Sequence, residues 1–270
     1  MRIRNIKREG LYPPVKPGSK STKIKVKVGN KTFLIVTHES EFSYMIYIGG
    51  RDVYCIEVQL LKPSIGANIS QGFFSKIRYD EGCALDTSFI RGEDSQLILK
   101  FLLTYIYYEY PYVKTMAYND LSTRECNDGS KVNLSEMTYI RTGKTWYEKN
   151  FDAYLQPEFS SIFKRKEEKF QELKKVMEWD TINVLTDRSY AEYKDLYNSS
   201  NTWQEFFGTI SDKIGITKFC ISASPWLSNF ITVYLQVLFI GFTYIIPIKD
   251  YDIPYIVQQG GKQDKKGKIV

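Results

Sequence analysis

The chain has 270 residues, of which 43 % are hydrophobic and 25 % are charged. This length and apolar content are enough to bury a large core, so they exclude a disordered chain and predict one large domain or a domain with an insertion. The formal net charge is +6, and the positive excess lies mainly in residues 1–27 and 251–270. Such basic ends can bind nucleic acid, acidic partners or anionic lipid, or they can simply solvate the chain ends.

Cysteine and histidine usage argues against a metal site. The four cysteines lie far apart in the sequence, without a Cys-x-x-C pair: Cys55, Cys83, Cys126 and Cys220. His38 is the single histidine, so we expect no zinc site and no His-paired hydrolase triad, and we interpret His38 as a structural residue at a strand end. Residues 1–10 are polar and basic, which is not typical of a signal peptide. We therefore expect reduced thiols in a cytoplasmic setting.

The N-terminal part predicts an arm followed by strands. Residues 1–21 hold Pro13, Pro14, Pro17 and Gly18, which favour extended or turn backbone, so we expect a basic flexible arm. Beyond it, apolar and polar residues alternate, and glycine-containing turns at 29–30 and 49–50 separate the alternating runs. This pattern predicts two hairpins, that is, four strands before residue 62.

The middle of the chain predicts a strand, a helix and another strand. Residues 73–79 are typical of a strand, which we expect to continue through 83–89. The acidic and hydroxyl residues 93–95 suit a helix N-terminus, and apolar side chains then recur at helical spacing as far as Pro111. Residues 112–118 follow as a strand, 134–142 as a short helix or turn, and 145–151 as an aromatic helix.

Residues 158–215 predict a helical insertion. The segment 163–179 is strongly charged with apolar residues on one side, which predicts an amphipathic helix. Two interpretations stay open: this helix covers the sheet, or together with the basic ends it binds protein partners.

Residues 219–248 contain no charged side chain, and 230–248 are apolar enough to raise the question of a membrane span. Apolar residues alternate with polar ones from Ile231 to Val237, and Gln236 would lie near the middle of a bilayer. This alternation favours strands in 216–250 that complete a sheet, followed by a basic tail at 251–270. A membrane helix over 230–248 stays open as an alternative.

Two motifs resemble the GNAT superfamily of acetyl-coenzyme A-dependent N-acetyltransferases. Arg91-Gly92 matches the start of that family's R-G-x-G-x-G/A turn, although Asp94 and Gln96 stand where later glycines belong. The run Trp146-Tyr147-Glu148-Lys149-Asn150-Phe151 resembles an aromatic-Tyr-Glu-Lys-x-Gly-Phe signature, without the glycine before Phe151. The resemblance implies an α+β fold with a mostly antiparallel central sheet flanked by helices. Its GNAT-like core would span residues 22–157.

The resemblance also implies a site and a reaction. Arg91, Gly92 and Ser95 would bind the pyrophosphate of acetyl-coenzyme A at a helix N-terminus. Tyr147 would protonate the leaving thiolate, and a carboxylate, Asp86 or Glu81, would act as the base that deprotonates the attacking amine. Asp94 would set negative charge against the phosphates and weaken their binding.

Four functions follow from these observations. The first is an N-acyltransferase that uses acetyl-coenzyme A, and the second is a catalytically inactive GNAT-like scaffold, which would suit a viral or virion-associated protein. The third is a membrane-associated protein anchored by 230–248. The fourth is a nucleic-acid binder without sequence specificity, for which the basic ends alone supply no known module. The expected location is cytoplasmic or virion-associated.

Overall fold

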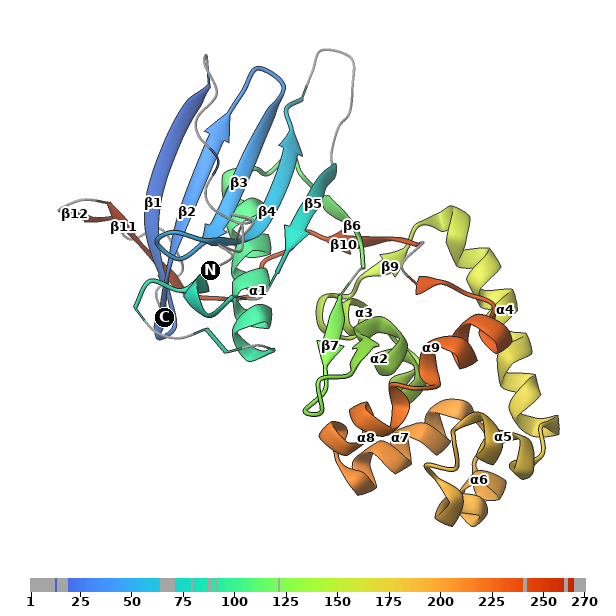
Figure 1. The fold of residues 1–270 in the computed structure, drawn as a ribbon. Coiled ribbons are helices and arrows are strands. Elements are labelled where there is room, and N and C mark those ends of the chain that lie inside the picture. The colour runs from blue at the N-terminus through green and yellow to red at the C-terminus, as the bar shows by residue number, and fades with distance from the viewer. Residues whose placement is uncertain are drawn as a thin grey trace, which may run out of the picture. The chain divides into compact units, whose positions relative to one another are not determined.

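The computed structural model describes residues 13, 19–63, 71–78, 80–86, 89–90, 92–120, 122–239, 242–259 and 262–264. The chain divides into two compact units (Figure 1). Unit 1 comprises residues 1–118 and 247–270, and unit 2 comprises residues 119–246. Helices and a mostly antiparallel sheet together confirm the predicted mixed α+β class.

Unit 1 is built on a sheet with the strand order β12-β11-β1-β2-β3-β4-β5-β6. Neighbouring strands are antiparallel except β5 and β6, which pair in parallel from Gln71↔Thr115 to Phe73↔Ala117. The strands are β1 (Lys20–Val28), β2 (Lys31–Glu39), β3 (Ser43–Gly49), β4 (Tyr54–Leu61), β5 (Gln71–Ile77), β6 (Thr115–Asn119), β11 (Tyr255–Gln259) and β12 (Lys262–Asp264). Gly29, with φ of 58°, makes the tight turn between β1 and β2, so both predicted hairpins are confirmed.

Helix α1 (Glu93–Glu109) connects β5 to β6 and lies against one face of this sheet (Figure 1). Its apolar residues Phe101, Leu102 and Ile106 are fully buried, and the Phe101 ring packs edge-on against Tyr255 of β11 with ring centroids 5.2 Å apart. The predicted helix is confirmed to within three residues at its start. It ends before Pro111, as expected from the missing amide hydrogen of proline.

The predicted continuation of a strand through residues 83–89 is wrong for 83–86 and 89, the residues of this range that the structure describes. Strand β5 ends at Ile77, and the short 3-10 helix η1 (Glu81–Cys83) follows. Asp80 caps η1, because its side chain accepts a hydrogen bond of 2.8 Å from the Gly82 amide. This local hydrogen bond stabilises a turn in the backbone of residues 80–83, and a backbone in that turn cannot continue the pairing of a strand.

The expectation of reduced cysteines is also wrong. Cys55 of β4 is bonded to Cys83 of η1, with Cα atoms 5.8 Å apart, and Cys126 is bonded to Cys220, with Cα atoms 5.7 Å apart. Each disulfide lies within one unit. The pairs are separated by 28 and 94 residues in sequence, so no short spacing motif could have indicated them.

Unit 2 is mainly helical. A hairpin of β7 (Thr123–Glu125) and β8 (Lys131–Asn133) leads into its helices, and β9 (Tyr154–Leu155) pairs antiparallel with β10 (Thr243–Pro247). The helices are α2 (Leu134–Thr142), α3 (Trp146–Phe151), α4 (Pro157–Val176), α5 (Trp179–Leu185), η2 (Ala191–Tyr193), α6 (Lys194–Ser199), α7 (Trp203–Ile214), α8 (Ile216–Ala223), α9 (Leu227–Phe230) and η3 (Ile231–Leu235). The predicted helical insertion at 158–215 is therefore helical throughout most of its length.

The core of unit 2 is aromatic. Trp203 of α7 stacks on Phe170 of α4 at 5.5 Å and meets Phe230 of α9 edge-on at 5.1 Å. Its indole Nε1 donates a hydrogen bond of 2.6 Å to the Phe170 carbonyl. Phe170 belongs to α4, so the apolar face of the predicted amphipathic helix packs against the aromatic core of unit 2.

The prediction of strands throughout 216–250 is wrong for most of that range. Residues 216–223 and 227–235 are helical, in α8, α9 and η3, and only β10 and the pairing of its Tyr244 with Leu155 agree with the prediction. Within the described residues, no helix combines the length and the apolar character that crossing a bilayer requires.

Candidate acyl-coenzyme A site

The N-terminus of α1 is where the predicted phosphate-binding turn lies. Gly92 is the N-cap with φ of 96°, a conformation that favours glycine, and its amide donates a hydrogen bond of 3.3 Å to the Ser95 Oγ. Gly92 and Ser95 are therefore brought together, as predicted, but they cap the helix by bonding to each other. Arg91, the third predicted cofactor-binding residue, lies outside the described residues.

Asp94 lies in the first turn of α1, within the predicted phosphate-binding turn. Its carboxylate accepts a hydrogen bond from the Ile90 amide and forms an ion pair of 3.1 Å with the Nζ of Lys31 on β2. Only 7 % of Asp94 and 5 % of Lys31 are exposed. A helix N-terminus favours an anion, and here the protein supplies that anion from its own side chain.

The two candidate bases lie close together in sequence, on the segment that follows β5. Asp86 accepts hydrogen bonds from the Thr32 amide at 3.0 Å and from the Thr32 Oγ1 at 2.6 Å. Desolvation tends to raise the pKa of Asp86, but hydrogen bonds from Thr32 and from the backbone of Asp86, together with the charge of Lys27, leave the pKa below its ordinary value. Glu81 is an exposed residue in the first turn of η1. A general base benefits from a raised pKa, whereas the pKa of Asp86 is lowered. The two hydrogen bonds from Thr32 make Asp86 a structural acceptor that joins its loop to β2.

Tyr147, the candidate acid, lies on α3 in unit 2 and is 5 % exposed. Its ring packs edge-on against Trp146, with centroids 4.8 Å apart, and lies 6.0 Å from Phe151. Burial raises the pKa of Tyr147 far above its ordinary value, and the negative charge of Asp120 adds to this shift. Both features are typical of a buried core aromatic.

Sequence reasoning missed Asp120, which is buried near the start of unit 2. Its carboxylate accepts hydrogen bonds from the Ser122 amide at 2.9 Å, from the Ser122 hydroxyl, and from the buried Ser135 hydroxyl of α2. The available signal was the Asp-x-Ser spacing, in which an aspartate side chain bonds the backbone two residues later. Asp120 thereby joins the end of β6 to α2.

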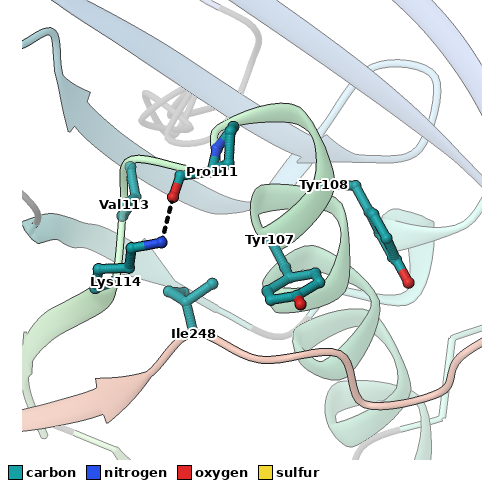
Figure 2. A pocket seen from close by; sticks show the side chains of 6 residues that line it. All are labelled: Tyr107, Tyr108, Pro111, Val113, Lys114 and Ile248. Atoms are coloured by element: carbon teal, nitrogen blue, oxygen red, sulfur yellow. Dashed lines mark hydrogen bonds between the residues drawn. The ribbon is translucent and has the colours of Figure 1, made fainter.

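A small cleft in unit 1 lies apart from every predicted site residue. Its volume is about 310 Å³, and Tyr107, Tyr108, Pro111, Val113, Lys114 and Ile248 line it (Figure 2). Figure 2 shows the Lys114 Nζ turned back to the Pro111 carbonyl, to which it donates a hydrogen bond of 2.6 Å. The Tyr108 hydroxyl donates to Asp250. Two polar side chains that border the cleft, Lys114 and Tyr108, are thus bonded within the protein.

Metal chemistry has no candidate in the part of the chain that the structure covers, because no group of three or more His, Cys, Asp or Glu side chains there could hold an ion. Comparison with known proteins found no match among family models, curated proteins or solved structures. Function is therefore inferred from the chemistry of the sites themselves.

Proposed function

We propose that this protein is a GNAT-like scaffold, an interaction or structural protein that does not use acetyl-coenzyme A. The observation that carries the proposal is the buried Asp94–Lys31 ion pair at the N-terminus of α1. The proposed protein-binding surface is the charged, exposed side of α4, and the basic ends of the chain are a separate proposed contact region. A virion-associated setting belongs to the same proposal, because two disulfides are uncommon in a cytoplasmic protein.

The order of elements supports the GNAT-like part. Strand β5 leads to the turn before α1, α1 leads to the parallel strand β6, and the aromatic helix α3 follows. The two GNAT-like motifs stand within this order of elements, the first just before α1 in sequence and the second in α3. A fold can persist without its chemistry, so the site has to be weighed separately.

The energetics of the ion pair support the loss of cofactor binding. A ligand with a micromolar Kd gains about 8 kcal/mol on binding. Separating a buried ion pair costs roughly 3–5 kcal/mol, because it leaves charges without compensation. A pyrophosphate that had to displace Asp94 would therefore bind with a Kd nearer to millimolar. The lowered pKa of Asp86 and the burial of Tyr147 weaken the two proposed proton-transfer roles in the same direction.

Isothermal titration calorimetry with acetyl-coenzyme A tests the proposal. We expect no saturable binding by the wild-type protein in the micromolar range. The double variant Asp94→Gly/Gln96→Gly restores the glycines of the family turn and removes the carboxylate, so it should bind at least tenfold more tightly than the wild type.

The matched control is Glu93→Gly, which removes an exposed charge beside Asp94 and restores no family glycine. It should bind acetyl-coenzyme A no better than the wild type. Micromolar binding by the wild-type protein that is lost in Arg91→Glu would overturn the scaffold proposal and favour the N-acyltransferase.

A further inference from the structure

The topology of unit 1 places β1 and β11, two strands from near the opposite ends of the sequence, side by side in the sheet. The strand order there is β12-β11-β1, so the strand that follows the N-terminal arm lies one strand away from the strand that precedes the C-terminal tail (Figure 1). We call this region the basic edge. Its described positive residues on β1 are Lys20, Lys23, Lys25 and Lys27.

The described centre of the basic edge is a line of three lysines on β1. Lys23, Lys25 and Lys27 are all exposed, whereas Val26 and Val28 between and beside them are fully buried. Alternate residues of a strand share one face, so these three side chains point the same way and repeat about every 6.8 Å. The chain thus holds a straight, evenly spaced row of positive charge on a rigid element.

Neighbouring acids do not neutralise this row. Among the described residues, none forms an ion pair with Lys23, Lys25 or Lys27. Asp86 lies near enough to Lys27 for a favourable charge interaction, but its carboxylate is bonded to Thr32. At the other end of β1, Glu39 is paired with Lys62 at 2.7 Å.

The apolar content of the edge is low. On β1 and β11, Ile256 is the one described large apolar side chain that is exposed, at 45 %. Peripheral lipid binding needs apolar insertion or a covalent anchor in addition to basic residues. A row of ammonium groups with little apolar surface instead complements a polymer of phosphates, since phosphate contacts dominate binding that is not sequence-specific.

We propose that the basic edge binds the phosphate backbone of nucleic acid without sequence specificity. This function is independent of acetyl-coenzyme A and of the surface of α4. The ligand is a polyphosphate backbone, which the β1 lysines contact in a line.

Fluorescence anisotropy with a labelled single-stranded oligonucleotide tests the proposal on the full chain. The affinity should fall steeply between about 50 and 200 mM salt, because counterions are released on binding. Lys23→Glu/Lys25→Glu/Lys27→Glu should weaken binding at least tenfold. It should also reduce the slope of log K against log salt by about 2–3, since each phosphate contact contributes roughly 0.7–0.9.

The control is Lys164→Glu/Lys169→Glu/Lys175→Glu, which makes the same change in net charge at exposed positions of α4. Its slope of log K against log salt should differ from that of the wild type by no more than roughly 0.7–0.9, the contribution of one phosphate contact. Both variants are first compared with the wild type by thermal melting. An equal loss of affinity in the two variants, no binding at low salt, or tighter binding to phosphatidylserine-rich vesicles than to the oligonucleotide would each overturn the proposal.

Discussion

Individual buried polar residues in unit 2 show how its helices are held together. Lys174 of α4 is 5 % exposed, and its Nζ donates hydrogen bonds to the carbonyls of Tyr197 at 2.9 Å and Ser200 at 3.0 Å. The ammonium also lies 3.7 Å from the centroid of the Tyr197 ring. Burial lowers the pKa of Lys174. The two carbonyls and the Tyr197 ring nevertheless stabilise the ammonium, which lies at the C-terminus of α6, where a cation is favourable.

Glu136 of α2 is a buried carboxyl group of which one oxygen lacks a hydrogen bond from the described residues. It is 4 % exposed, its Oε1 accepts a hydrogen bond of 3.3 Å from the Ser228 hydroxyl, and its Oε2 has no hydrogen-bond partner among the described residues. Burial raises the pKa of Glu136, and the Ser228 hydrogen bond opposes this shift only in part. The folded protein therefore holds the Glu136 proton more tightly than the unfolded chain does.

This raised pKa predicts a pH dependence. The stabilising contribution of protonated Glu136 is fully present below the unfolded pKa of about 4.5 and is lost as the pH rises through the higher folded pKa. Glu136→Gln keeps an acceptor for Ser228 and removes the charge. At neutral pH it should stabilise unit 2 by about 1.4 kcal/mol for each unit by which the pKa is raised.

Urea denaturation at acidic and neutral pH measures this effect. Glu172→Gln, at an exposed position of α4, is the control and should leave the pH dependence of the wild type unchanged. An unfolding free energy for Glu136→Gln that follows the wild-type pH profile would contradict the assignment of the buried proton to Glu136.

At the scale of elements, the sequence predicted the hairpins and α1 because their signals are local. Alternation and a Gly-Asn turn define β1 and β2 within residues 20–39, and apolar side chains recur at helical spacing along the 17 residues of α1. The site was predicted less well. The sequence indicated that residues 93–95 begin a helix, but it did not indicate the ion pair of Asp94. The partner of Asp94 is Lys31, which lies more than 60 positions earlier on another strand.

The strand prediction at 231–237 failed because its window was too short. Over a longer window, the buried side chains follow helical spacing, at Phe219, Cys220, Ala223, Leu227, Phe230, Ile231 and Leu235. Alternation across only seven residues is also compatible with the end of such a helical run. Packing of these side chains against the aromatic core of unit 2 then decides between the two periods.

The contact between α2 and α7 supplies a prediction at this scale. A Cβ atom on Gly208 of α7 would lie 2.7 Å from the Arg141 carbonyl oxygen of α2, a backbone atom that cannot move aside cheaply. Gly208→Ala should therefore destabilise unit 2 by about 1–3 kcal/mol, although alanine is the better helix former. Thr209→Ala is the control for helix propensity. A rise in the melting temperature of Gly208→Ala would contradict the close approach of the two helices.

At the scale of the whole molecule, each unit contains one disulfide. Cys55–Cys83 closes a loop of 28 residues in unit 1, and Cys126–Cys220 closes one of 94 residues in unit 2. The chain-entropy treatment assigns roughly 3–4 kcal/mol to the shorter loop and about 4–5 kcal/mol to the longer one. We expect Cys126→Ser/Cys220→Ser to be the more destabilising pair.

Hydrogen exchange separates the two effects, because it reports protection in each unit. Cys55→Ser/Cys83→Ser should accelerate exchange mainly in unit 1, and Cys126→Ser/Cys220→Ser mainly in unit 2. Alkylation and mass spectrometry of the unreduced wild-type protein should detect no reactive thiol. Four alkylated cysteines would contradict both bonds.

The discontinuity of unit 1 has a consequence for biosynthesis. Residues 119–246 leave the ribosome as an uninterrupted stretch, so unit 2 can complete its fold while unit 1 still lacks β11 and β12. Until Tyr255–Gln259 has been translated, the β1 edge that later pairs with β11 exposes its backbone amides and carbonyls. During this interval the β1 lysines oppose edge-to-edge pairing with other unfinished copies of the chain, because their like charges repel one another.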